Sequence, residues 1–183
     1  MGERLAARIR SERESRGWSV ADLAQRSGVS RAMIAKIEKG QSSPTAMLLG
    51  RLSGALGVTM SALLARAEAG EFPRLIRQAD QSVWRDPRTG YVRRQVFPVP
   101  GSSLPVDLVE VELPAGAVVA FPASSYTFIR ELIWVLSGEL VFVEGEVSRH
   151  LRRGDGLELG PPCDCRFENR SRAGCRYVVL VHR

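Results

Sequence analysis

Apolar residues in the first third of the chain recur every three or four positions, which is the spacing of one helix face. The pattern predicts five helices, within residues 3–16, 19–27, 31–39, 44–56 and 59–67. Ser19 and Ser30 stand where N-cap hydroxyls are needed, and Asp22 completes a capping box with Ser19. Gly28 and Gly40 are C-terminal stops. The first third is therefore expected to be a helical bundle.

Beyond residue 74 the apolar residues tend to alternate, and Pro or Gly recurs every few residues. Strands are predicted at residues 106–113, on both sides of Ser137-Gly138, and at 175–183. A hairpin is predicted at residues 83–92, with its turn around Asp86-Pro87. Its arginines suit a dimer contact, an anion-binding rim or a solvated turn, and we favour the solvated turn. The fold class is α + β, with a helical domain at 1–66, a linker at 67–74 and an antiparallel β-sandwich or barrel at 75–183.

The composition is that of a globular protein: 183 residues, 44% hydrophobic and 25% charged. The sequence has no apolar run long enough to cross a bilayer and no signal-peptide core at its start. Three cysteines, Cys163, Cys165 and Cys175, are an odd number, which favours free thiols. We expect a cytoplasmic protein.

The net charge of +6 is unevenly distributed. Residues 1–66 hold 11 Arg and Lys against 5 Asp and Glu, so the whole excess lies there, and residues 67–183 are neutral. A basic domain suits a polyanion such as DNA, although a solvated helical surface would look the same.

Two predicted helices joined by "SGVS", residues 27–30, have the spacing of a helix-turn-helix. The second helix would turn its front end outward, with Ser30, Ala35 and Lys36 on the exposed side. Arg31 is expected to pair with guanine and Ala32 to contact a thymine methyl. Phosphate contacts are expected from Ser19, Gln25, Lys36, Lys39, Gln41, Ser42 and Ser43.

The segment "WSVADLAQRSGVSRAMIAKIEKGQSSPT" resembles the phage-repressor-like (XRE) helix-turn-helix family. The matching features are Leu23-Ala24, "SGVS", the run "IEKG" and Pro44-Thr45. The resemblance implies a five-helix lambda-repressor-like bundle with a recognition helix beginning near Ser30. It also implies that Glu38 is structural and forms a salt bridge with an arginine of the first helix.

The second part resembles the cupin family of small antiparallel jelly-roll β-barrels. Gly116, Glu131 and Gly138 match the first family motif, and Gly154 and Asn169 match the second. In metal-binding cupins these motifs carry histidine ligands, but this chain has Ser125, Thr127 and Cys165 in those positions. We therefore expect no metal, no cofactor and no enzyme activity. Cys165 is interpreted as a core residue, with a redox role as the alternative.

The barrel mouth remains a natural place for one small ligand. Ser125, Thr127, Glu131 and Cys165 are candidates to contact it, and Arg94 or Arg176 to hold a carboxylate. The alternative is that these side chains only fill the barrel.

The order of the two parts resembles that of bacterial transcriptional regulators whose barrel senses a metabolite, by resemblance an amino acid or a related compound, and dimerises the protein. We expect a homodimer on operator DNA. Two alternatives stay open: a metal-dependent cupin enzyme with an appended DNA-binding domain, and a DNA-binding protein whose barrel only dimerises.

Overall fold

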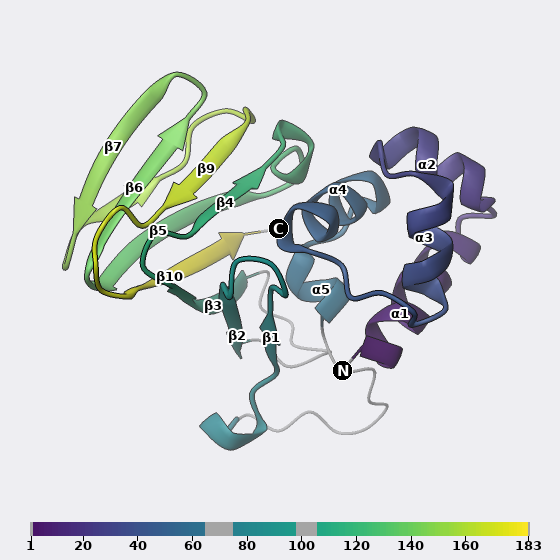
Figure 1. Ribbon diagram of the computed structural model, residues 1–183, viewed down its shortest axis with the longest axis horizontal. Coiled ribbons are helices and arrows are strands. Elements are labelled where there is room, and N and C mark those ends of the chain that lie inside the picture. The colour runs from purple at the N-terminus through teal and green to yellow at the C-terminus, as the bar shows by residue number, and fades with distance from the viewer. Residues whose placement is uncertain (1, 65–74, 98–105, 183) are drawn as a thin grey trace.

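The computed structural model describes residues 2–64, 75–97 and 106–182. Helices occupy the first stretch, which we call the helical region, and strands occupy the other two, which we call the β region (Figure 1). The predicted division into helical and antiparallel β parts is confirmed. The predicted linker, residues 67–74, lies outside the described residues.

The helices begin and end close to the predicted capping residues. They are α1 (Gly2–Glu14), α2 (Val20–Ser27), α3 (Arg31–Glu38), α4 (Ala46–Leu56) and α5 (Met60–Leu64). Ser19 and Asp22 form the predicted capping box of α2, and Ser30 accepts a hydrogen bond from the amide of Met33 to cap α3. Gly28 has φ +65°, a left-handed conformation that lets the chain turn sharply between α2 and α3. No helix among these described segments is long and apolar enough to cross a membrane.

The β region consists of two antiparallel sheets. The first has the order β1-β2-β3-β10-β5-β8 and the second β4-β9-β6-β7. The strands are β1 (Val83–Arg85), β2 (Val92–Phe97), β3 (Val106–Leu113), β4 (Val118–Phe121), β5 (Arg130–Ser137), β6 (Glu139–Glu144), β7 (Val147–Arg152), β8 (Gly156–Glu158), β9 (Cys165–Glu168) and β10 (Cys175–His182). Two short 3-10 turns, η1 (Gln78–Asp80) and η2 (Ala123–Ser125), complete the described elements.

The turn at Ser137-Gly138 differs from a hairpin. It separates two strands, as the sequence predicts, but β5 belongs to the first sheet and β6 to the second. Gly138 has φ +77°, and a Cβ there would lie 2.8 Å from the carbonyl oxygen of Gly174. Glycine is therefore required where the chain crosses between sheets.

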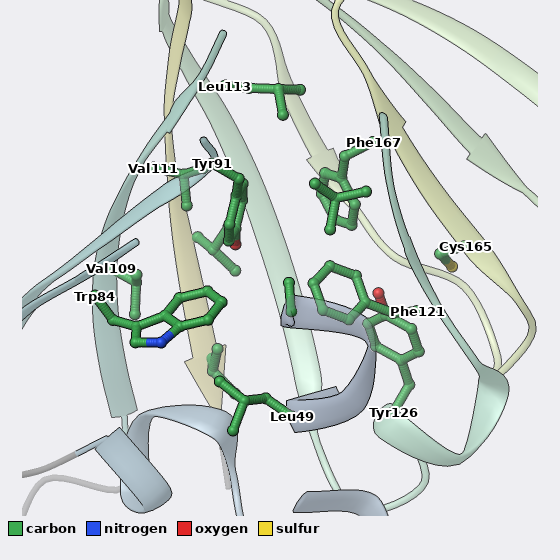
Figure 2. Close-up of a cluster of buried hydrophobic side chains, with 14 of the residues drawn as sticks. Leu49, Trp84, Tyr91, Val109, Val111, Leu113, Phe121, Tyr126, Cys165 and Phe167 are labelled. Atoms are coloured by element: carbon green, nitrogen blue, oxygen red, sulfur yellow. The ribbon is translucent and has the colours of Figure 1, made fainter. Parts of the chain in front are cut away.

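Aromatic side chains fill the space between the sheets. Phe167 stacks on Tyr177 at 5.7 Å between ring centroids and packs against Phe142 at 4.9 Å. Figure 2 shows that Leu49 of α4 points into the same cluster as Trp84 and Phe121. A residue of the helical region thus helps to close the core of the β region.

The hairpin of β1 and β2 binds the start of α4. The strands pair as predicted, with Trp84 opposite Arg93. In the turn, Oδ2 of Asp86 accepts a hydrogen bond from the amide of Ala46, the first residue of α4, at 2.7 Å. Asp86 is buried, and its charge lies at the positive end of the helix dipole. The preferred interpretation of a merely solvated hairpin was therefore wrong, because this turn holds the two regions together.

Candidate DNA-binding face and interdomain cavity

One side of helix α3 packs into the bundle, and its opposite side is exposed to solvent. Ile34 and Ile37 are buried, whereas Arg31, Ala32 and Lys36 are exposed. Of the other predicted DNA contacts, the exposed ones are Ser19, Gln25, Ser30, Lys39, Gln41 and Ser43, and the partly buried ones are Ala35 and Ser42. The surface that the sequence predicts for DNA is thus accessible.

The position of α3 is fixed by a two-point ion pair with α1. Nε and Nη2 of Arg13 donate to the two carboxylate oxygens of Glu38 at 2.8 and 2.9 Å. Nη1 of Arg13 donates to the carbonyl of Trp18, just before α2. This confirms the structural role that the family resemblance implies for Glu38. One guanidinium ties three segments of the helix-turn-helix together.

Ser19 is less available for a phosphate contact than its place at the start of α2 indicates. Its hydroxyl donates to Asp22 at 2.7 Å, and the same carboxylate accepts from its amide at 2.8 Å. These bonds lower the pKa of Asp22. Its carboxylate therefore stays negative at the N-terminal end of α2, the end that a phosphate would approach.

A cavity lies where α4 and α5 meet the β region. Its volume is about 40 Å³. The helical side contributes hydroxyl, methylene and thioether groups, and the β side contributes three tyrosines and two ionisable groups. The lining residues are Gly50, Ser53, Thr59, Met60, Ser61, Tyr91, Arg93, Phe121, Ser125, Tyr126, Ile129, Glu131, Phe167, Tyr177, Val179 and Val181. The cavity is therefore shared between the two regions.

Two of the predicted ligand residues, Ser125 and Glu131, line this cavity. Thr127 is exposed, and its hydroxyl donates to the carbonyl of Ser124. Strand alternation would put Ser125 and Thr127 on one side, but residues 123–125 form the 3-10 turn η2, where that period does not apply. Thr127 therefore lies outside the cavity that Ser125 faces.

Cys165 is buried but does not line the cavity. It belongs to the same buried cluster as Phe121 and Phe167, and Figure 2 draws it at the edge of that view. Its thiol donates to the carbonyl of Cys163, and burial, with Cys163 close by, raises its pKa to about 12. A thiol that stays protonated is a poor nucleophile, which supports the interpretation as a core residue.

Arg94 and Arg176, predicted to hold a carboxylate, do not line the cavity. Both pair with Glu110 on the outer face of the first sheet. The inward arginine is Arg93, whose register partner is the buried Val111. The sequence contained a usable signal, since period-2 alternation puts Arg93 on the same side as the aromatic Tyr91.

Arg93 and Glu131 give the cavity its charge. Arg93 is only 9% exposed and donates to the hydroxyls of Tyr91 at 3.3 Å and Ser61 at 3.2 Å. Glu131 is partly buried, and burial raises its pKa to about 7, against the opposing effect of Arg93. Glu131 thus changes its charge near neutral pH.

The raised pKa of Glu131 predicts a pH-dependent stability. Between pH 4.5 and about 7 the folded protein binds this proton more tightly than the unfolded chain, so the free energy of unfolding falls as pH rises. The glutamine of the Glu131→Gln variant carries no ionisable proton. At about pH 8 the free energy of unfolding of the variant should exceed that of the parent by about 1–2 kcal/mol, whereas at about pH 4 the two proteins should be about equally stable. Urea unfolding at both pH values measures this difference. The exposed Glu112→Gln is the control, and an equal effect of both variants would contradict the prediction.

The residues in the metal-ligand positions of the cupin motifs do not fit a transition metal. They are Ser125, Thr127 and Cys165, of which Thr127 faces solvent and Cys165 keeps its proton. Among the described residues, no group of three His, Cys, Asp or Glu side chains is arranged to hold a metal ion. Asn169 has a structural role, because its buried amide donates to the carbonyls of Leu113 and Ala173.

Comparisons with known proteins agree with these two parts. Residues 9–63 match the family model described as HTH_3, helix-turn-helix. The HTH-type transcriptional regulator SutR of Escherichia coli is 25% identical over 179 residues, 97% of this chain and 94% of that protein. SinR of Bacillus subtilis, also an HTH-type transcriptional regulator, is 27% identical over 94 residues, 51% of this chain and 85% of SinR.

The whole fold is shared with a solved protein. The crystal structure of an HTH_3 family transcriptional regulator from Vibrio cholerae superposes with a TM-score of 0.81. It covers 100% of this chain and 96% of its own, at 23% identity. Together, the matches show that residues 9–63 form a helix-turn-helix domain of the HTH_3 family and that the chain is similar over nearly its whole length to an HTH-type transcriptional regulator.

Proposed function

We propose that this regulator binds specific operator sequences through α3 and that a small metabolite bound by the cupin-like part changes its DNA affinity. In this proposal residues 1–66 act as a five-helix DNA-binding bundle, 67–74 as a linker and 75–183 as a jelly-roll barrel. The observation that carries it is the outward side of α3, where Arg31 and Ala32 of the first turn and Lys36 of the last turn are exposed on a helix that Ser30 caps.

The exposed side chains divide by role. Arg31 and Ala32 lie in the first turn of α3, the part of a recognition helix that reaches base edges. Ser30 and Ala35 flank them. Phosphate contacts, which set the register of the protein on DNA, fall to Ser19, Gln25, Lys36, Lys39, Gln41, Ser42 and Ser43.

Arg31→Ala and Lys39→Ala should weaken DNA binding in different ways. Loss of a bidentate contact to guanine should cost about 1–3 kcal/mol and relax the preference at one base pair. Loss of a phosphate contact should weaken all sequences alike and reduce the slope of affinity against salt by about one. Titration of the protein with fragments selected from a random pool, at several salt concentrations, measures both effects.

Arg172→Ala, an exposed arginine of the β region, is the control for lost charge. If Arg31→Ala keeps the parent's base preference, the assignment of α3 as the reading helix is wrong.

The relatives named as transcriptional regulators support a role without catalysis. An enzyme of the cupin type would need an open metal site. The side chains in the ligand positions do not supply one, as described above. A ligand can shift DNA affinity only by binding one arrangement of the protein better than another, so the effector must contact a part that differs between arrangements.

A homodimer would present two recognition helices to two operator half-sites. The outer face of the first sheet offers an apolar surface for it, where Trp134 is 49% exposed, Leu132 41% and Leu180 36%. Leu132 and Leu180 are register partners on neighbouring strands, so their side chains form one patch. We propose that a second copy of the chain covers this patch.

Trp134→Arg should convert the dimer to a monomer, because a charge would be buried at the centre of the contact. Sedimentation velocity measures the mass. Val147→Arg places the same charge at an exposed apolar residue of the other sheet and should leave the dimer intact. A monomeric parent protein, or loss of the dimer in both variants, would contradict the proposal.

A further inference from the structure

The cavity between the helical and β regions differs from an ordinary packing defect because polar groups face it. Its helical wall includes Gly50 and Ser53 of α4 and Ser61 of α5. Its opposite wall carries Arg93 and Glu131. A void in a well-packed core is normally apolar, whereas polar walls indicate an occupant that forms hydrogen bonds.

Two residues that line the cavity each carry a buried polar atom with no hydrogen-bond partner among the described residues. These atoms are Nε of Arg93 and Oγ of Ser125. Leaving such groups unpaired costs free energy, more so for a charged group. The other bonds of Arg93, at 3.2 and 3.3 Å, are longer than the 2.7–2.9 Å typical of a guanidinium bound to a carboxylate. Arg93 is therefore available for a stronger acceptor.

Glu131 supplies the opposite charge in the same cavity. Within the part of the chain that the structure describes, its side chain has neither a salt bridge with Arg93 nor a hydrogen bond. A buried cation and a nearby carboxyl group that do not neutralise each other match a ligand that carries both complementary charges.

We infer that this cavity is the effector site and that its ligand is a small zwitterion, with a carboxylate on Arg93 and Ser125 and an ammonium group on Glu131. An amino acid with a short side chain has this chemistry. The inference rests on the proposed function, since it specifies the metabolite class and the position of the site that the regulator uses.

The cavity is small, so the binding of an amino acid would move the walls, one of which belongs to the DNA-binding region. A volume of about 40 Å³ holds about three water molecules, at about 10–15 Å³ each, and an amino acid needs more room. The wall formed by α4 and α5 belongs to the DNA-binding region. The hydrogen bond from Arg93 to Ser61 joins that wall to the β region, and a ligand carboxylate would compete for the same guanidinium. Binding therefore moves the helical region relative to the sheets.

The experiment is calorimetric titration of the full-length protein with each standard amino acid, with acetate and ethylamine as probes that carry one charge each. At least one amino acid should bind at least tenfold more tightly than acetate or ethylamine. Arg93→Gln and Glu131→Gln should each weaken that binding at least tenfold, and Ser125→Ala about threefold. Arg94→Gln, one residue along on the outer face, is the matched control and should bind as the parent does.

Specific outcomes would overturn the inference. If no amino acid binds, or if Ser125→Ala and Glu131→Gln bind as tightly as the parent, the cavity is not the effector site. These two variants keep the test valid if Arg93→Gln does not fold. DNA binding by the ligand-free protein is measured separately. A protein that prefers its operator but binds no amino acid retains the proposed function and loses this inference. A protein that binds an amino acid at the cavity but prefers no DNA sequence retains the ligand site and loses the proposed function.

Discussion

Replacing Glu38 with alanine is expected to lower the free energy of unfolding by about 3–5 kcal/mol. The side chains of Arg13 and Glu38 are only 10% and 7% exposed, and two hydrogen bonds join them. Without the carboxylate, the guanidinium of Arg13 remains in the bundle with only the half-exposed Glu14 as a counter-charge. Urea unfolding of the full-length protein measures the loss, and operator affinity should fall as well because α3 loses its link to α1.

Glu14→Ala is the matched control, since Glu14 also pairs with Arg13 but its side chain is 50% exposed. Solvent screens an exposed pair, so this variant should lose much less stability than Glu38→Ala. Equal losses in the two variants would show that the Arg13–Glu38 pair does not hold α3 in place.

Replacing Gly54 with leucine is expected to weaken the packing of α4 on the β region by about 3 kcal/mol. A Cβ at this position would lie 2.8 Å from the carbonyl carbon of Ser124 and still closer to its oxygen. Both are backbone atoms of η2 and cannot rotate away as a side-chain end can. Limited proteolysis and small-angle scattering should detect separation of the two regions, and the DNA-binding face should stay folded.

Gly174→Leu is the control, because a Cβ at Gly174 meets no atom within 4 Å. It should leave the overall dimensions and protease resistance unchanged. If Gly54→Leu is also as compact and protease-resistant as the parent, then α4 does not depend on close contact with η2.

Helix α4 connects the helical region and the β region. It packs against α2 in the helical region and against β4 and η2 in the β region, and Figure 1 shows it between α2 and the sheets. Asp86 binds its first amide, and Leu49 enters the aromatic cluster. A change on the β side of α4 therefore has a short and rigid route to the helix-turn-helix.

Local signals in the sequence were sufficient to predict the helices and the exposed side of α3. The caps Ser19 and Ser30 act through bonds within one turn, so their effect does not depend on distant residues. The exposed side of α3 follows from its apolar period. The pairing of Glu38 with an arginine was implied by family resemblance, but Arg13 was identified as the partner only in the structure.

The candidate ligand site was predictable only in part. Glu131 and Ser125, two of the residues expected to contact a ligand, line the cavity, whereas Arg93 lines it in place of the predicted Arg94 and Arg176. Two adjacent arginines in a strand point to opposite faces of the sheet. The two arginines alone do not show which of them points inward, because that depends on the residues on either side. No local pattern in the sequence indicates that Ser61 and Gly50 line the cavity, because this depends on how two segments far apart in the chain pack together.

Helix starts, strand alternation and the end of the chain that carries the positive charge can all be predicted from the sequence, because they depend on neighbouring residues and on residue counts. The contacts of α4 and of the hairpin turn at Asp86 that join the two regions, and the cavity that Arg93 and Glu131 share beneath α4 and α5, are visible only in the folded protein. Such contacts join residues far apart in the chain. They follow from the packing of surfaces, which no local pattern specifies.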